Sequence, residues 1–190
     1  MKLFLVRHGE TKENEERILM GHHHGILTEK GKEQAKATAL SLKGYKLDQI
    51  YSSDLNRCVD TAEFIKEYHP DTPVTFTHEL RERNLGNLQG KKSASVDWDG
   101  LPGDGDHKKP ENGESIAELK IRALDFVKRL YEQHPNDSIL LVSHNGWIKQ
   151  ILSHFTGVHS KDIHTIENAQ IVEIEIGKNM TGRILNQNKL

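Results

Sequence analysis

The chain has 190 residues, a length that suits one domain and is sufficient to bury a core of its own. Its 26 lysine and arginine residues nearly balance its 28 aspartate and glutamate residues, so the formal net charge is −2. This balance gives no reason to expect nucleic acid or an anionic membrane as a partner, and any positive potential must be local. We expect residues 1–190 to form a single domain.

Cysteine content and hydropathy give a first indication of the compartment. Cys58 is the only cysteine, so the chain cannot form an internal disulfide, which fits a reducing environment. The N-terminal apolar run stops at Arg7 and is shorter than the ~7–15 apolar residues of a secretory signal. No stretch approaches the ~20 apolar residues that cross a bilayer. We therefore expect a cytoplasmic protein.

Strand and helix patterns alternate through the first 80 residues. A continuous apolar run at residues 3–6 predicts a strand buried on both faces, whereas the polar stretch at residues 12–25 has no periodic pattern. Thr28 is a suitable N-cap for the helix that follows, and Gly44 is a suitable stop. The expected elements are strands at residues 2–6, 49–52 and 73–77 and helices at residues 29–42 and 53–68.

A long segment without periodicity, residues 86–113, separates the two halves of the pattern. We expect a loop there, with one short helix near residues 93–98. Loops of this length inside a compact domain are usually lids or binding segments. The elements expected after it are a helix from 114 or 115 to about 133, a strand at 138–142, a helix at 145–155, a strand at 170–176 and an edge strand at 182–186.

This alternation predicts an α/β fold, a three-layer α/β/α sandwich around a mainly parallel central sheet. In such sheets ligands bind just beyond the carboxyl ends of the strands. The apolar runs at residues 3–6 and 139–142 each end in a polar residue that is followed by a histidine, His8 or His144. Two imidazoles and the guanidinium of Arg7 at one sheet edge indicate a phosphate site.

The chemistry of phosphate transfer accounts for three further residues. Arg57 lies in the first turn of the helix after the second strand, and arginine presents a fork of donors that fits phosphate oxygens. The amides at Asn145, where a helix begins, can also bind an anion. His8 can attack phosphorus to form a covalent intermediate, because the positive charge nearby favours its neutral form.

An acid is needed to protonate the leaving oxygen. Glu82 lies in a polar turn after the third strand, and a phosphate dianion bound beside it would favour the protonated carboxyl. Such a group can donate a proton and later accept one from water. We expect Arg81 and Arg83, its neighbours, to point to the opposite face of an extended segment.

The order of these residues resembles the signature of the histidine phosphatase superfamily, which includes the cofactor-dependent phosphoglycerate mutases. Two departures are Gln89, where many relatives carry glutamate, and Cys58, where alanine is usual. The matching blocks, over about residues 2–147, are Arg7-His8-Gly9-Glu10-Thr11 with Asn14 and Gly21, Leu27-Thr28-x-x-Gly31, Ser52-Ser53-Asp54-Leu55-x-Arg57 with Thr61-Ala62, Leu80-Arg81-Glu82 with Gly86 and Gly90, Asn112-Gly113-Glu114-Ser115, and Ser143-His144-Asn145-Gly146.

The resemblance implies a phosphoglycerate mutase-like fold and a reaction on a small phosphorylated substrate that needs neither metal nor cofactor. His8 would become phosphohistidine and Glu82 would be the proton donor. The residues that would hold the phosphoryl group are Arg7, Arg57 and His144, and those that would line the site are Asn14, Gly21 and Asn145.

Hydrolysis of a phosphate monoester is the favoured reaction, because residues 85–113 are shorter than the corresponding insertion of the mutases that the chain resembles. A mutase stays an alternative, as does a module that binds phosphorylated ligands without turnover. His22-His23-His24 lack the spacing of zinc ligands and are expected at the pocket rim. The sequence leaves the substrate and the oligomeric state open.

Overall fold

The structure, a computed structural model, describes residues 1–187. Its described strands form one six-stranded sheet in the order β3-β2-β4-β1-β5-β6. The first four strands are parallel to one another, whereas β5 is antiparallel to both of its neighbours, β1 and β6, so the prediction of a mainly parallel sheet is confirmed. The strands are β1 (Lys2–Arg7), β2 (Gln49–Ser53), β3 (Val74–Thr77), β4 (Ser138–Ser143), β5 (Ile171–Ile176) and β6 (Gly182–Gln187).

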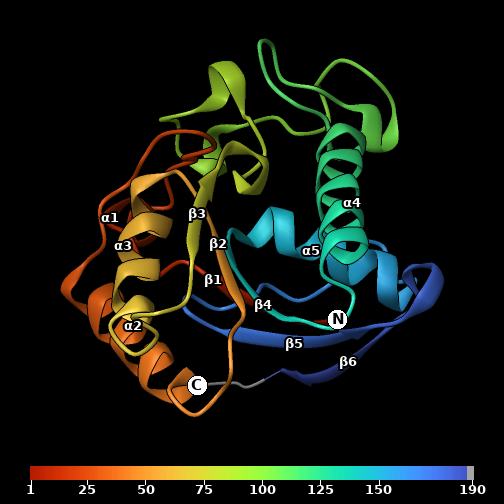
Figure 1. Cartoon of the computed structure of the whole chain (residues 1–190). Helices are drawn as coiled ribbons and strands as arrows, with labels where there is room; N and C mark the ends of the chain where they lie inside the picture. The colour runs from red at the N-terminus through yellow and green to blue at the C-terminus, as the bar shows by residue number, and fades with distance from the viewer. Residues whose placement is uncertain (188–190) are drawn as a thin grey trace.

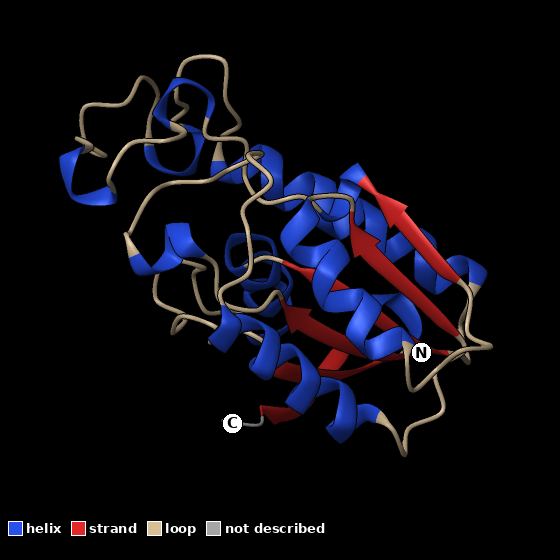
Figure 2. Ribbon diagram, turned by 90° about the vertical axis from the view of Figure 1, so that its left-hand side faces the viewer, coloured by secondary structure: helices blue, strands red, loops and turns tan. Residues whose placement is uncertain are grey.

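Helices cover both faces of this sheet and complete the predicted three layers (Figures 1 and 2). On one face α2 (Glu29–Leu42) packs against α3 (Asn56–Lys66). On the other face α4 (Ile116–Gln133) packs against α5 (Asn145–Thr156). The connections between parallel strands pass through these helices, so the strand ends meet at one edge.

Alternation along β1 explains why its apolar run is continuous. Leu3 and Leu5 belong to the core beneath α4 and α5, whereas Phe4 and Val6 belong to the core beneath α2 and α3. Successive side chains of a strand point to opposite faces of the sheet. All four are buried because helices cover both faces. Burial of each contributes on the order of 1.5–3 kcal/mol.

The helix ends follow local signals. The Thr28 hydroxyl accepts a hydrogen bond from the Gly31 amide, as expected of the N-cap of α2. Ser115 forms a capping box with Glu118 at the start of α4. Gly157, in the left-handed region with φ of 72°, ends α5.

Three local predictions need correction. The helix expected at residues 53–68 is α3, which is shorter at both ends. It begins later because the chain stays extended through Leu55 after β2. The stretch at residues 12–25 contains one helical turn, α1 (Lys12–Glu15), which a capping box stabilises and which is too short to show periodicity. The helix expected near 93–98 is a three-residue 3₁₀ turn, Ser93–Ser95.

Residues 86–113 form an excursion beyond the sheet edge, at the top of Figure 1. Its regular structure consists of isolated 3₁₀ turns, which agrees with the expected long loop. Among the described residues, no helix has both the length and the apolar character needed to cross a membrane.

Candidate active site

The register of the central strands brings the two histidines together. β1 and β4 are parallel and pair Arg7 with Ser143, so the next residues, His8 and His144, leave the sheet side by side. The centroids of their rings are 5.3 Å apart. β2 ends beside β4, which brings α3 and Arg57 to the same edge.

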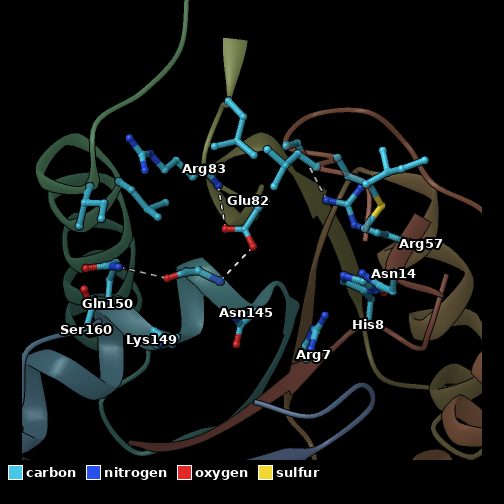
Figure 3. A pocket seen from close by; sticks show the side chains of 18 of the residues that line it. Arg7, His8, Asn14, Arg57, Glu82, Arg83, Asn145, Lys149, Gln150 and Ser160 are labelled. Atoms are coloured by element: carbon cyan, nitrogen blue, oxygen red, sulfur yellow. Dashed lines mark hydrogen bonds between the residues drawn. The ribbon is translucent and has the colours of Figure 1, made fainter. Parts of the chain in front are cut away.

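A cavity of about 350 Å³ opens at this edge (Figure 3), a volume typical of small-molecule sites. His144 does not line it, since this residue lies behind Arg57 and is fully buried. The other predicted site residues all line the cavity: Arg7, His8, Asn14, Gly21, Arg57, Glu82 and Asn145.

His8 has the protonation pattern of a nucleophile. Its Nδ1 lies 2.7 Å from the carbonyl oxygen of Gly9, which can only accept, so Nδ1 carries the proton and Nε2 keeps its lone pair. Burial lowers the pKa of His8 well below its ordinary value, and the charges of Arg57 and Arg7 lower it further. At neutral pH His8 is therefore an uncharged imidazole with one free nitrogen.

The turn after His8 depends on two glycines in contact. A Cβ on Gly9 would lie 2.4 Å from the carbonyl oxygen of Gly31, and a Cβ on Gly31 would lie 2.0 Å from that of Glu10. Backbone occupies the space on both sides, so neither position can take a side chain without moving α2 away from the turn. This contact gives a physical reason for Gly31 in the sequence pattern.

Two guanidinium groups supply the donors for an anion. Arg7 donates to the carbonyl of Ile166 (2.7 Å), and its buried Nε has no hydrogen-bond partner among the described residues. Arg57 uses four of its five N–H groups, on His144 (3.1 Å) and on the carbonyls of the loop at residues 21–24, which leaves one for a ligand. Burial lowers the pKa of both arginines because it removes water from their charged groups. A phosphate dianion between them would compensate for this lost hydration.

His144 orients Arg57. Its Nδ1 accepts the hydrogen bond from Arg57 Nε, so its Nε2 carries the proton and donates to the hydroxyl of Ser53 (2.9 Å). Burial, followed by the charge of Arg57, lowers the pKa of His144 well below its ordinary value. The expectation that His144 holds the phosphoryl group directly stays a prediction, because in this structure both ring nitrogens contact protein groups. Cys58 packs against the same ring, with its sulfur 3.4 Å from Nε2.

Glu82 is held by two backbone amides, one at the start of α5 and one from its own neighbour in the chain. Its Oε2 accepts from the amide of Gly146 (2.9 Å) and its Oε1 from that of Arg83 (2.8 Å). A Cβ on Gly146 would lie 2.3 Å from Oε1, so only glycine permits this approach. In Figure 3 the carboxyl group lies between Arg7 and His8 on one side and Lys149 on the other.

Arg122 of α4 fixes the segment that carries Glu82, a role that no sequence motif indicates. Its guanidinium donates to the carbonyls of Glu79 (2.7 Å), Arg81 (2.9 Å) and Glu82 (3.2 Å). It also pairs with both carboxylate oxygens of Glu114, at 3.0 and 2.8 Å. Glu114 is part of the recognised pattern, but an arginine eight residues later on a helix has no motif to mark it.

The three consecutive histidines, expected at the pocket rim, are not among the residues that line the cavity, but they contact residues that are. The carbonyls of His23 and His24 accept from Arg57, while His22 Nε2 donates to the carbonyl of Glu82 (2.9 Å). The side-chain oxygen of Gln89 accepts from the amide of His22 at 2.6 Å. An amide oxygen suffices for this contact, which explains how glutamine can stand where many relatives have a carboxylate.

The arginines beside Glu82 behave differently from each other. Arg81 points away and pairs with Asp54 through two hydrogen bonds, at 2.7 and 2.6 Å, as expected. Arg83 lines the cavity together with Glu82, so the expectation that it faces away was wrong. Residues 81–85 lie outside any strand, and the strict alternation of side chains therefore does not hold there.

Further lining residues come from α5 and the segment after it, and they carry no motif. They are Lys149, Gln150, Ser160 and Lys161.

Comparison with known proteins gives a consistent result. A family model described as histidine phosphatase superfamily (branch 1) matches residues 3–188. A probable phosphatase of Schizosaccharomyces pombe is 32% identical over 97% of the chain and 91% of its own length. The adenosylcobalamin/alpha-ribazole phosphatase of Escherichia coli is 30% identical over 83% of the chain and 80% of its own length. A solved structure of a mycobacterial glucosyl-3-phosphoglycerate phosphatase superposes with a TM-score of 0.88 at 26% identity, covering 100% of the chain and 99% of its own.

Proposed function

The chain belongs to the histidine phosphatase superfamily (branch 1), and on that premise we propose that it hydrolyses monoesters of small phosphorylated metabolites through a phosphohistidine at His8. The relatives that support hydrolysis carry phosphatase names and match most of the chain. We further propose that residues 1–190 act as one domain in the cytoplasm, where the single cysteine would stay a thiol.

In the first step, the ester phosphate binds between Arg7 and Arg57. The lone pair of His8 Nε2 attacks phosphorus, and the bond to the ester oxygen breaks with its electron pair on that oxygen. Glu82 gives its proton to the departing oxygen, so an alcohol leaves rather than an alkoxide. Amides near Asn145 and the side chain of Asn14 complete the surroundings of the transferring group.

In the second step, water takes the place of the alcohol. Glu82, now a carboxylate, accepts a proton from water while the water oxygen attacks phosphorus. The bond between phosphorus and His8 breaks, its electron pair returns to Nε2, and inorganic phosphate leaves. The same carboxyl group thus serves as acid and then as base.

The observation that carries this proposal is the hydrogen bond from His8 Nδ1 to Gly9, because it frees Nε2 toward a cavity with two buried guanidinium groups. The test is a phosphate-release screen over phosphorylated metabolites with a chelator present and His8→Ala as the blank. We expect chelator-insensitive release by the wild type and acid-labile, base-stable label on His8 after rapid quenching. Turnover that survives in His8→Ala contradicts the proposal, and label moved to another hydroxyl of the substrate identifies a mutase.

A further inference from the structure

We propose that the cavity contains a second anion subsite, formed by Lys149, Gln150 and Ser160, which binds a carboxylate or phosphate group of the substrate other than the ester that is cleaved. This inference rests on the proposed function, since it names the class of leaving group that the same site accepts. The substrate would be a phosphorylated acid or a bisphosphate rather than the ester of a neutral alcohol.

Position along α5 is the first argument. Gly146, Lys149 and Gln150 line the cavity from one side of this helix, as residues three and four apart share a face. Gly146 binds the carboxylate of Glu82, and Lys149 follows about 4.5 Å further along the helix axis. An ester whose leaving oxygen reaches Glu82 therefore extends its remaining atoms toward Lys149, on the side of Glu82 away from His8 (Figure 3).

Unused polar atoms in the cavity wall are the second argument. Gln150 is 4% exposed and Ser160 is 6% exposed. Gln150 donates to the carbonyl of Gly146 at 3.3 Å, but its oxygen and the Ser160 hydroxyl have no protein partner among residues 1–187. Both side chains line the cavity and these atoms are open to it, so a polar group of a ligand can reach them, and the hydroxyl can donate to an anion.

Charge decides between a neutral and an anionic group. A phosphate dianion would compensate the charges of Arg7 and Arg57. Three cations of the cavity lining are then left for the leaving group: Arg83, Lys149 and Lys161. None of these three forms an ion pair with a carboxylate in the described part of the chain. Asp162 and Glu82 act on Lys149 electrostatically without pairing with it. The charged residues that line the cavity are Arg7, Arg57, Arg83, Lys149 and Lys161 against one carboxylate, Glu82.

Lys149 is the cation best placed to select an anion. Arg83 directs two nitrogens to the carbonyls of Glu114 and Lys108, and Lys161 is exposed. Lys149 is half-buried, and burial lowers its pKa, so a second negative charge beside it would offset the lost hydration. A neutral polyol would satisfy Gln150 and Ser160 but would leave this charge without compensation.

The test measures binding in the His8→Ala background, where the esters stay intact. Calorimetry compares phosphoglycolate with ethyl phosphate, which has a methyl group in place of the carboxylate, and propanediol bisphosphate with propyl phosphate. We expect the doubly anionic member of at least one pair to bind about tenfold more tightly. The pair that shows the difference identifies the second group as carboxylate or phosphate.

Substitutions then assign the effect to Lys149. Lys149→Met should remove most of the tenfold preference and Lys149→Arg should retain it, while Lys128→Met, a control at an exposed lysine of α4, should leave it unchanged. Equal affinities within both pairs, or a preference that survives Lys149→Met, would overturn the subsite. If the wild type cleaves neutral-alcohol esters as well as anionic ones, only the subsite fails. If it cleaves no monoester while the binding preference holds, the proposed function fails and the subsite stands.

Discussion

Replacing Arg122 with methionine should slow the reaction by removing the support of the acid while leaving the phosphate site intact. The guanidinium lies outside the cavity and fixes three carbonyls of the segment around Glu82, as well as the carboxylate of Glu114. Methionine keeps much of the apolar stem and removes every donor. Arg7 and Arg57 do not contact Arg122, so the binding of phosphate should change little.

The structure sets the size of both effects. Breaking a buried ion pair by removing one partner costs ~3–5 kcal/mol, but the side chains of Arg122 and Glu114 keep exposures of 20% and 15%. Solvent therefore compensates in part, and we expect a loss of about 2–3 kcal/mol in the free energy of unfolding. Displacement of the Glu82 carboxyl by on the order of 1 Å would cost roughly 100-fold in rate.

The informative assay varies the leaving group. An alkyl ester needs a proton from Glu82, whereas a dinitrophenyl ester releases a stable phenolate without one. We expect kcat for the alkyl ester to fall about 100-fold in Arg122→Met with KM nearly unchanged, and kcat for the dinitrophenyl ester to change only a few-fold. Glu82→Gln should show the same selective loss, and to a larger extent.

A matched control lies on the same helix. Arg129 pairs with Glu79 at the surface, with side-chain exposures of 48% and 31%, so Arg129→Met should cost less than about 1 kcal/mol and should not alter the leaving-group dependence. An equal loss on both esters in Arg122→Met would refute the reasoning, since it would point to general distortion of the site.

Three further predictions concern buried or closely packed residues. In the unfolded chain His8 and His144 protonate near their ordinary pKa of 6.5, whereas in the folded state they protonate only well below it. The free energy of unfolding should therefore fall as the pH drops below 6.5, by up to about 1.4 kcal/mol per pH unit for each histidine. Chemical denaturation of His144→Gln across that range should show a shallower dependence of this free energy on pH. Gly146→Ala should reduce turnover of alkyl esters more than of dinitrophenyl esters, because its Cβ would displace Glu82; equal losses would contradict this. Burial raises the pKa of Cys58 to about 12, so iodoacetamide should label this thiol only after unfolding, as mass spectrometry can check.

Local patterns were sufficient for most of the fold. The continuous apolar run of β1 could be read as a strand buried on both faces, because each successive side chain enters the opposite core. Thr28 and Gly157 marked helix ends through hydrogen bonds and backbone angles that involve only neighbouring residues. The convergence of His8 and His144 at one edge also followed, since parallel strands end together.

Contacts between distant segments could not be read in the same way. The partners of Arg122 lie up to 43 residues away in the sequence, and the Ser53 hydroxyl that fixes the proton of His144 lies 91 residues away. Lys149 and Ser160 line the cavity without any motif. Periodicity reports which face of an element is buried, but it carries no information on which other element covers that face.

The amino-acid sequence by itself determined the layers of the fold, the edge of the sheet where the candidate site lies and the residue types that meet there, because these depend on patterns within single strands, helices and turns. Only the tertiary structure decided which nitrogen of each histidine carries the proton, what holds Glu82 in place and which further side chains line the cavity. Those properties depend on individual hydrogen bonds between segments far apart in the chain, and such bonds exist only after the layers have packed.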